Sequence, residues 1–210
     1  MYDLPYYKEQ DVKAVIKFMQ QHPFAMLIGS AGDIPVATQV PLLIEERSSK
    51  IFLKGHMMRN TDHHKALEQN NKVLCVFTGA HTYVSASWYQ NPQVGSTWNY
   101  MSVHARGTLR FVDGASLIEI LRHTTAQFEN NPHSPALFHH LPEDYVQRLV
   151  KAIVGFEIEV TALENVFKLS QNQDEKSYQN IIQELQAGEA DAQEIASEMA
   201  RRSSQLFDIS

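Results

Sequence analysis

The stretch from Gly79 to Gly107 constrains the fold more than any other part of the sequence. Its segments Tyr83–Trp88 and Trp98–Val103 are rich in β-branched and aromatic residues, which favours β-strands. The segment NPQVG at 91–95 lies between them and breaks regular structure. We therefore predict two strands joined by a loop whose aromatic and amide side chains can stack on a planar ring and bond its edge. The alternative is a hairpin whose aromatic residues fill its own core.

Charge and cysteine content narrow the class of protein. The chain has 24 acidic and 18 basic residues among 210, a net charge of −6, which gives no bulk attraction to nucleic acid or to an anionic membrane. The single cysteine, Cys75, lies in the apolar run 73–77, so we expect an inert core thiol and no intrachain disulfide. No stretch approaches the roughly 20 apolar residues of a membrane span. These features predict a cytoplasmic protein.

The periodicity of the remaining sequence predicts strands interrupted by helices. The expected strands are Phe24–Gly29, Val36–Ile44 with Pro41 at an edge or bulge, Ile51–Lys54, Lys72–Thr78, Gly155–Leu163 and Val166–Asn172. The expected helices begin after Asp11, at Asn60 or Thr61, at Ser116, around Pro142, and twice after Asp174 with Gly188 between them. This order predicts an α+β fold, an antiparallel split β-barrel with flanking helices and a C-terminal helical tail. We place the barrel domain at residues 1–172 and the helical extension, packed on the barrel or on a partner subunit, at 173–210.

The segment GFEIEVTAL at 155–163 alternates strictly between apolar and polar residues. Phe156 and Ile158 should face inward, and Glu157 and Glu159 should face solvent. This pattern is typical of a half-exposed antiparallel strand.

The segment Gly55–Leu67 suggests a place for an anion. The first turn of a helix capped by Asn60 or Thr61 would present backbone amides with partial positive charge. Arg59 and Lys65 would add charged donors, and arginine matches phosphate oxygens with two parallel bonds. An ordinary solvated helix start is the equally weighted alternative.

Other catalytic patterns are absent or weak. His63 and His64 are adjacent on a helix and point about 100° apart, so they do not easily share one metal ion. Ser85, Ser87, His81 and His104 lack the spacing of a nucleophile-base set, and the sequence has no dinucleotide fingerprint, phosphate loop or nucleophile elbow. The parts that remain suit a phosphorylated planar cofactor that carries any redox chemistry itself.

Six phrases, in order, resemble one known family. They are PLLIE (41–45), LKGHMMRN (53–60), TYVSASWY (82–89), STWNYMSVHARG (96–107), AIVGFEIEVT (152–161) and FKLSQN (167–172). Together they are similar to the PaiB family of bacterial FMN-binding negative transcriptional regulators, from Met1 to about Leu185. The resemblance implies a pyridoxamine-phosphate-oxidase-like split barrel that binds FMN at the interface of a homodimer.

The resemblance also implies roles for particular residues. It places Thr38 and Gln39 on the strand that lines the flavin, and Lys54, His56, Arg59 and Asn60 near the ribityl phosphate. It places Trp98 and Asn99 near the isoalloxazine, and Lys168, Ser170 and Gln171 as residues that close the pocket. Gln39 and Thr61 stand where the family pattern often has histidine and proline. No catalytic residue and no metal ligand follow from the resemblance.

Three functions fit these expectations. The first is a PaiB-type regulator, although the acidic chain and the lack of a helix-turn-helix with a basic recognition helix argue against direct DNA binding. The second is a flavin-dependent oxidoreductase with a nicotinamide donor. The third is haem binding by a related barrel, with His56 or His104 as the candidate ligand.

Overall fold

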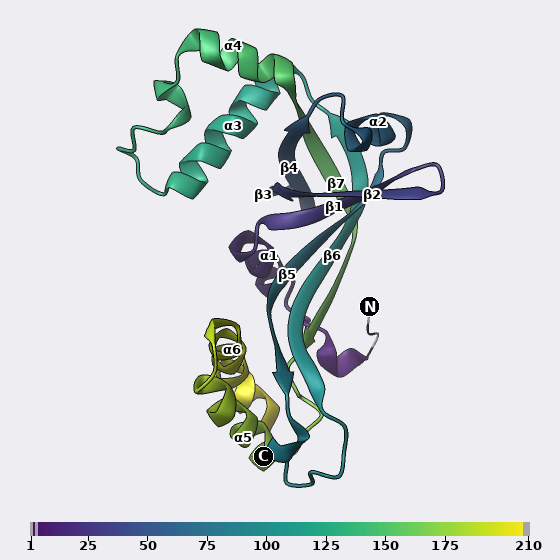
Figure 1. Ribbon diagram of the computed structural model, residues 1–210, viewed down its shortest axis with the longest axis vertical. Coiled ribbons are helices and arrows are strands. Elements are labelled where there is room, and N and C mark those ends of the chain that lie inside the picture. The colour runs from purple at the N-terminus through teal and green to yellow at the C-terminus, as the bar shows by residue number, and fades with distance from the viewer. Residues whose placement is uncertain (1, 3, 208–210) are drawn as a thin grey trace. The chain divides into compact units, whose positions relative to one another are not determined.

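The protein is built on a seven-stranded sheet. The computed structural model describes residue 2 and residues 4–207. The strand order is β2-β1-β5-β6-β7-β4-β3 (Figure 1), and the pairs β1–β2, β1–β5, β3–β4 and β4–β7 are antiparallel. The strands are β1 (Phe24–Ala31), β2 (Ile34–Pro41), β3 (Leu43–Arg47), β4 (Lys50–Met58), β5 (Lys72–Val84), β6 (Thr97–Phe111) and β7 (Ile153–Lys168). The predicted α+β class, an antiparallel split barrel with helices, is confirmed.

Within the described residues, six α-helices and three short 3-10 turns accompany the sheet. The α-helices are α1 (Val12–Gln21), α2 (Asp62–Gln69), α3 (Gly114–Glu129), α4 (Glu143–Ala152), α5 (Glu175–Gln186) and α6 (Ala190–Phe207). The 3-10 turns are η1 (Pro5–Tyr7), η2 (Ala86–Trp88) and η3 (Phe138–His140). None of the helices in the described part of the chain is long and apolar enough to cross a membrane.

The chain divides into two compact units. We call Ile16–Phe77 with His104–Glu164 the sheet unit, and Met1–Val15 with Thr78–Val103 and Asn165–Ser210 the tail unit. The long strands β5, β6 and β7 each contribute residues to both units.

Alternation along the strands builds the core of the sheet unit. Leu27, Leu53, Phe156 and Ile158 are all completely buried, as inward positions of β1, β4 and β7. The strands β6 and β7 approach closely at Gly107, where an added Cβ would lie 2.6 Å from the backbone oxygen of Glu159. Only glycine fits there without a shift of the backbone.

Two strands in the first half of the chain replace the single strand predicted at Val36–Ile44. The strand β2 ends at Pro41 and β3 begins at Leu43. Between them, the amide of Leu42 donates to the carbonyl of Pro23 at 2.9 Å. Proline has no amide hydrogen for a ladder, and β2 is an edge strand, where this is tolerated. The predicted edge position of Pro41 is confirmed, and the continuous strand is wrong.

Three other predicted strands prove to be longer. Ile51–Lys54 extends to Met58, Lys72–Thr78 runs on to Val84, and Gly155–Leu163 continues to Lys168. The strand predicted through Trp88 stops at Val84, because residues 86–88 form the turn η2. Tertiary pairing sustains these strands across polar residues that weaken the local pattern.

Helix caps were partly predictable. Of the two predicted caps, Asn60 and Thr61, it is Thr61 that caps α2, because its hydroxyl accepts a hydrogen bond of 3.1 Å from the amide of His64. The prediction that Ser116 caps α3 is wrong. Asp113 does so, accepting from the amide of Ser116 at 2.8 Å. The helix begins at Gly114, so Ser116 lies inside its first turn and supplies the amide that Asp113 caps.

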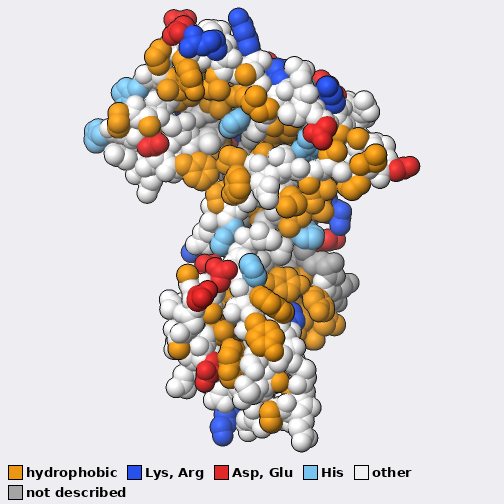
Figure 2. Space-filling model, viewed as in Figure 1, with side chains coloured by type: hydrophobic (Ala, Val, Ile, Leu, Met, Phe, Trp, Pro, Cys, Tyr) orange, Lys and Arg blue, Asp and Glu red, His pale blue; other side chains and the backbone are white. Residues whose placement is uncertain are grey.

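The helices α3 and α4 pack against each other within the sheet unit. Leu117, Leu121, Phe138 and Ile153 form their buried cluster. Partly buried apolar side chains pack around this cluster. Figure 2 shows hydrophobic side chains gathered over α3 and α4 at the top of the view.

The helices α5 and α6 lie side by side in the tail unit (Figure 1). Tyr178, Ile195 and Met199 are completely buried between them and their neighbours. Ser177 accepts from the amide of Gln90 at 2.9 Å, and Asn180 donates to the carbonyl of Trp88 at 3.1 Å. The helices are thus packed on the segment after β5.

The predicted domain boundary at residues 172 and 173 stays a prediction.

Candidate functional site

The strand β4 and the turn after it carry four predicted phosphate residues in the sheet unit. Lys54 and His56 are two residues apart on β4 and share one face of the sheet. The ammonium of Lys54 forms an ion pair with Glu45 and lies 3.9 Å from the carboxylate of Glu157. Its charge is therefore already compensated, and its contact with a phosphate stays a prediction.

His56 offers an unsatisfied polar atom. Its Nδ1 is buried and has no hydrogen-bond partner within the described chain. Burial lowers the pKa of His56 below its ordinary value, because the charged imidazolium is poorly solvated there. A neutral ring with an orphaned nitrogen is suited to a hydrogen bond with a ligand.

Arg59 and Asn60 form the turn that leads into α2. The amide of Arg59 donates to the carbonyl of Ala152 at 2.9 Å, which fixes the backbone while the side chain remains exposed. No ion pair to Arg59 occurs among residues 2 and 4–207. Asn60 has a φ of 62°, a left-handed conformation that asparagine adopts more readily than most residues.

The amides at the start of α2 are less available than the sequence suggests. The side chain of Asp62 accepts from the amide of His63 at 2.8 Å, and Thr61 accepts from the amide of His64. The acid in the first turn also offsets the positive end of the helix. An anion at this helix start stays a prediction, with Arg59 as the charged donor beside it.

Neighbouring predicted residues on a strand face opposite sides. On β2, Gln39 is exposed and pairs with Met26, whereas Thr38 is half-buried and pairs with Leu27. Because successive strand side chains alternate, Thr38 and Gln39 do not line one surface together. Of this pair, Gln39 is the residue on the open face.

The same rule separates Trp98 from Asn99 in the tail unit. Trp98 is 53% exposed and Asn99 is 0% exposed, on opposite faces of β6. The indole lies 6.0 Å from the ring of His81 and 6.1 Å from that of Tyr83, measured between centroids. A pocket of about 280 Å³ opens beside it, lined by Thr78, Gly79, His81, Trp98, Tyr100 and Met101.

The other predicted residues of the tail unit form a buried polar network. Ser170 donates to Oδ1 of Asn99 at 3.0 Å, and Asn99 donates to Sδ of Met199 at 3.4 Å. Lys168 donates to the hydroxyl of Thr97 at 2.5 Å and to the carbonyl of Trp98 at 2.6 Å. Burial lowers the pKa of Lys168. The structure brings Asn99, Lys168 and Ser170 together beneath the strand that carries Trp98.

Gln171 is also engaged within the protein. Its amide group accepts from the backbone of Leu169 at 2.7 Å and donates to the carbonyl of Phe167 at 2.5 Å. These bonds fix the end of β7. A direct contact of Lys168, Ser170 or Gln171 with a cofactor stays a prediction.

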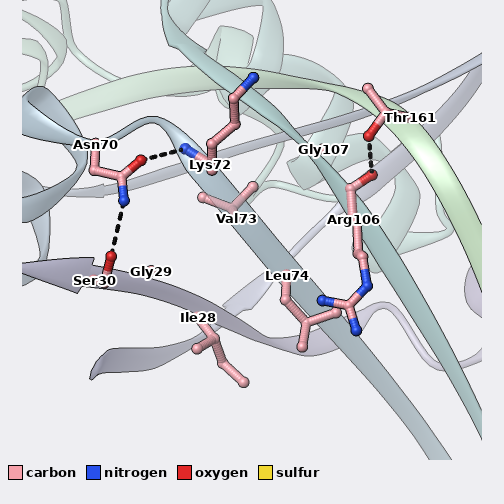
Figure 3. A pocket seen from close by; sticks show the side chains of 10 residues that line it. All are labelled: Ile28, Gly29, Ser30, Asn70, Lys72, Val73, Leu74, Arg106, Gly107 and Thr161. Atoms are coloured by element: carbon pink, nitrogen blue, oxygen red, sulfur yellow. Dashed lines mark hydrogen bonds between the residues drawn. The ribbon is translucent and has the colours of Figure 1, made fainter. Parts of the chain in front are cut away.

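A second pocket, of about 450 Å³, lies on the sheet unit and was not predicted (Figure 3). Lys72 and Arg106 border it, and Asn70 donates to the hydroxyl of Ser30 at 2.8 Å on its wall. The sequence gives no sign of this pocket, because the polar residues that line it lie on segments that are far apart in the chain.

Glu157 departs from its predicted exposure. It is 4% exposed, and its carboxylate accepts from Arg110 at 2.6 Å and also from Arg47. Although burial raises the pKa of Glu157, the hydrogen bonds from Arg110 and Arg47 hold it below its ordinary value. The alternating pattern gave the correct face of the strand. It did not show that distant arginines cover that face.

Among the described residues, the histidine and cysteine side chains form neither a metal site nor a reactive thiol. No group of three or more His, Cys, Asp or Glu side chains in residues 2 and 4–207 is arranged to hold a metal ion. Cys75 is buried, and burial raises its pKa to about 12, so its thiolate is not formed near neutral pH.

Each unit by itself holds a residue that suits one part of a flavin mononucleotide. In the sheet unit, the exposed guanidinium of Arg59, which has no ion pair within the described residues, suits a phosphate group. In the tail unit, the exposed indole of Trp98 beside an apolar pocket suits an aromatic tricycle. The orphaned nitrogen of His56 adds a polar contact. With its antiparallel sheet, this chain is of the flavin-binding split-barrel class.

Comparison with known proteins identifies the family. Residues 1–162 match the family described as “Putative FMN-binding domain”. PaiB of Bacillus subtilis (strain 168), named Protease synthase and sporulation protein PAI 2, is 31% identical over 186 residues, covering 89% of each chain. The chain belongs to this FMN-binding family, and the predicted resemblance to PaiB and the FMN cofactor are confirmed.

More distant similarities agree with the fold. Uncharacterized protein AN0679 of Emericella nidulans is 28% identical over 217 residues, covering 89% of this chain and 86% of that protein. The solved FAD and heme binding protein from Mycobacterium smegmatis has a TM-score of 0.56 at 13% identity, covering 77% of this chain and 73% of that one. The flavocytochrome Anf3 from Azotobacter vinelandii has a TM-score of 0.57 at 13% identity, covering 80% and 72%.

Proposed function

We propose that the protein is a PaiB-type homodimeric regulator of transcription that binds FMN, with the indole of Trp98 in contact with the flavin ring. The observation that carries the proposal is the half-exposed indole of Trp98 beside an apolar pocket of about 280 Å³. A large aromatic side chain left this exposed next to an apolar hollow is typical of a ligand-binding or interaction surface.

The ring end of the flavin is assigned to Trp98. Its indole, with His81 and Tyr100 beside it, offers a flat surface for offset stacking on an isoalloxazine. Lys168 fixes the backbone of this residue by its bond to the Trp98 carbonyl. Lys168 therefore supports the ring surface from the buried side of β6.

A phosphate contact is proposed, from the sheet unit by itself, for Arg59. Its backbone is anchored and its guanidinium has no competing carboxylate in the described chain. By contrast, Lys54 is already paired with Glu45. A charged hydrogen bond from Arg59 to the phosphate would contribute about 1.5–3 kcal/mol.

A riboflavin comparison tests both assignments. Riboflavin lacks the phosphate, so Arg59→Ala should weaken FMN binding by roughly 10- to 150-fold in Kd and leave riboflavin binding unchanged. Trp98→Ala should weaken the binding of FMN and the binding of riboflavin, and the two Kd values should rise by about the same factor as each other. Phe128→Ala, which removes an equally exposed aromatic ring on α3, is the control. A colourless wild-type protein that does not bind added FMN contradicts the proposal.

An uncovered apolar face supports the homodimer. Phe24 is 65% exposed and Met26 is 37% exposed, on the same face of β1. Their partners in the adjacent strand are Pro41 and Gln39, so the predicted flavin residue Gln39 shares this face. A second copy that covered it would remove apolar surface from water. Phe24→Glu should convert a dimer to a monomer in sedimentation analysis, whereas Val12→Glu, at an exposed apolar position of α1, should not.

The regulatory role rests on the family resemblance and on the relative's name, which links that protein to protease synthesis and sporulation. The net charge of −6 argues against strong electrostatic binding to DNA by this chain alone. We therefore propose that regulation operates through a protein partner. A steeply salt-dependent shift of a promoter fragment at nanomolar protein would contradict this.

A flavin oxidoreductase is the second candidate. The exposure of Trp98 favours it, because a ring stacked there would leave its other face open to a nicotinamide donor. Consumption of NADH by the FMN-loaded protein, abolished by Trp98→Ala, would support the enzyme over the regulator.

A further inference from the structure

The pocket of about 450 Å³ in the sheet unit (Figure 3) is lined by none of the residues assigned to FMN. It lies on the outer face of the sheet. Ile28 of β1 pairs with Leu74 of β5, whereas the neighbouring pair, Leu27 and Cys75, is 0% exposed on the opposite face. The volume of the pocket is within the range of small-molecule sites, roughly 300–1,000 Å³.

The floor of the pocket is apolar. Ile28 and Leu74 lie side by side on adjacent strands, and both are half-buried. On β1, Ile28 continues the row of Phe24 and Met26, so the pocket borders the face proposed for the homodimer. A ligand with an apolar body would remove this floor from water.

The rim of the pocket carries two cations and no carboxylate. Lys72 and Arg106 are the charged residues among the ten that line it. The ammonium of Lys72 donates to the neutral hydroxyl of Thr108 at 2.9 Å, and it forms no ion pair with any described residue. Lys72 therefore presents a positive charge beside an apolar floor.

The carboxylates around the pocket are engaged with other cations. Glu164 lies 3.8 Å from the guanidinium of Arg106, so these two charges compensate each other. Glu159, on the same face of β7 as the lining residue Thr161, is paired with Lys50 at 2.5 Å. The charge of Lys72 is the one that a ligand is needed to match.

Neutral polar groups hold the wall beside Lys72. Asn70 donates to the hydroxyl of Ser30 at 2.8 Å and accepts from the backbone amide of Lys72 at 3.1 Å, and Figure 3 shows both bonds. The hydroxyl of Ser30 accepts in this bond, so its own hydrogen is free to be donated. The wall thus offers a second donor next to the ammonium.

We propose that this pocket binds a small carboxylate that has an apolar body. The body packs on Ile28 and Leu74, and the carboxylate lies at Lys72 with the hydroxyl of Ser30 as a further donor. An ammonium is a compact single charge, which suits one carboxylate better than a divalent phosphate. The combination of an apolar floor with one charged group is typical of a small-molecule site.

Three probes of related shape test the two parts of the site: benzoate, acetate and benzyl alcohol. Each is titrated into the FMN-saturated protein at constant ionic strength, and the backbone amide resonances are followed by NMR. Benzoate should shift the amides of the lining residues Gly29 and Gly107 saturably. Acetate lacks the apolar body and benzyl alcohol lacks the charge, so each should bind at least roughly fivefold more weakly.

Three results would overturn the proposal. They are failure of benzoate to bind, binding of acetate or benzyl alcohol as tight as that of benzoate, and shifts at Gly79, beside Trp98, without shifts at Gly29 and Gly107. Failure of FMN to bind would count only against the proposed function, and the same titration then uses the protein without added FMN.

A matched pair of variants separates this site from general surface charge. Lys72→Met keeps a long side chain without the charge, and it should raise the Kd of benzoate roughly five- to tenfold. Lys17→Met removes an exposed lysine of α1 that has no ion pair among the described residues, and it should leave the Kd unchanged. Equal weakening by the two variants, or no effect of Lys72→Met, contradicts the site. Circular dichroism and FMN titration confirm that each variant is folded.

Discussion

Ser170 donates a hydrogen bond of 3.0 Å to Oδ1 of Asn99, a residue 71 positions earlier in the chain, and both side chains are buried. The bond joins the end of β7 to the strand that presents Trp98 on its opposite face. The surface proposed for the flavin ring thus rests on an interior polar network.

Ser170→Ala should reduce the free energy of unfolding by about 1–3 kcal/mol, because it leaves the Asn99 oxygen buried without a partner. Ser170 has a φ of 61°, in the left-handed region. Ser170→Gly should therefore cost less than Ser170→Ala, since glycine relieves the strain. Urea unfolding measures both, with the exposed Ser87→Ala as control. Equal stability of Ser170→Ala and the unmutated protein would contradict the network.

Gly107→Ala should destabilise the protein by about 1–3 kcal/mol through overpacking, because the added methyl would collide with the backbone of β7. Gly95→Ala is the matched control, since no heavy atom lies within 4 Å of its added Cβ. Thermal and urea unfolding of the two variants should differ clearly. A Gly107→Ala protein as stable as Gly95→Ala would refute the close approach of β6 and β7.

Thr61→Ala should cost about 1 kcal/mol of stability through loss of the cap of α2. Thr61→Ser keeps the hydroxyl and should retain most of the stability. If serine proves no better than alanine in urea unfolding, the capping bond does not contribute.

Acid should weaken the start of α5. Hydrogen bonds from the hydroxyl and amide of Ser177 lower the pKa of Asp174 from 3.8 to about 2. Because the pKa is lower in the folded state, the stabilisation is complete above pH 3.8 and is lost as pH falls towards 2. The stability advantage over Asp174→Asn should shrink across this range in urea unfolding. A constant difference would contradict the assigned cap.

Local patterns determined much of this protein from its sequence alone. The apolar positions Phe156 and Ile158 were assigned to the core by their alternation, the cap of α2 was narrowed to Asn60 or Thr61, and the C-terminal helices were separated at Gly188. The family phrases predicted the fold class and FMN. These features depend on residues that are close together in the chain, so the sequence displays them directly.

Tertiary structure decided which polar residues are buried and which are open. Glu157 was expected in solvent, but Arg47 and Arg110 arrive from other strands and make its burial tolerable. Trp98 and Asn99 were expected together, yet the pleat of β6 turns one outward and the other inward. Cross-strand partners are set by register between distant segments, and the free energy of burying a charge or an amide depends on those partners.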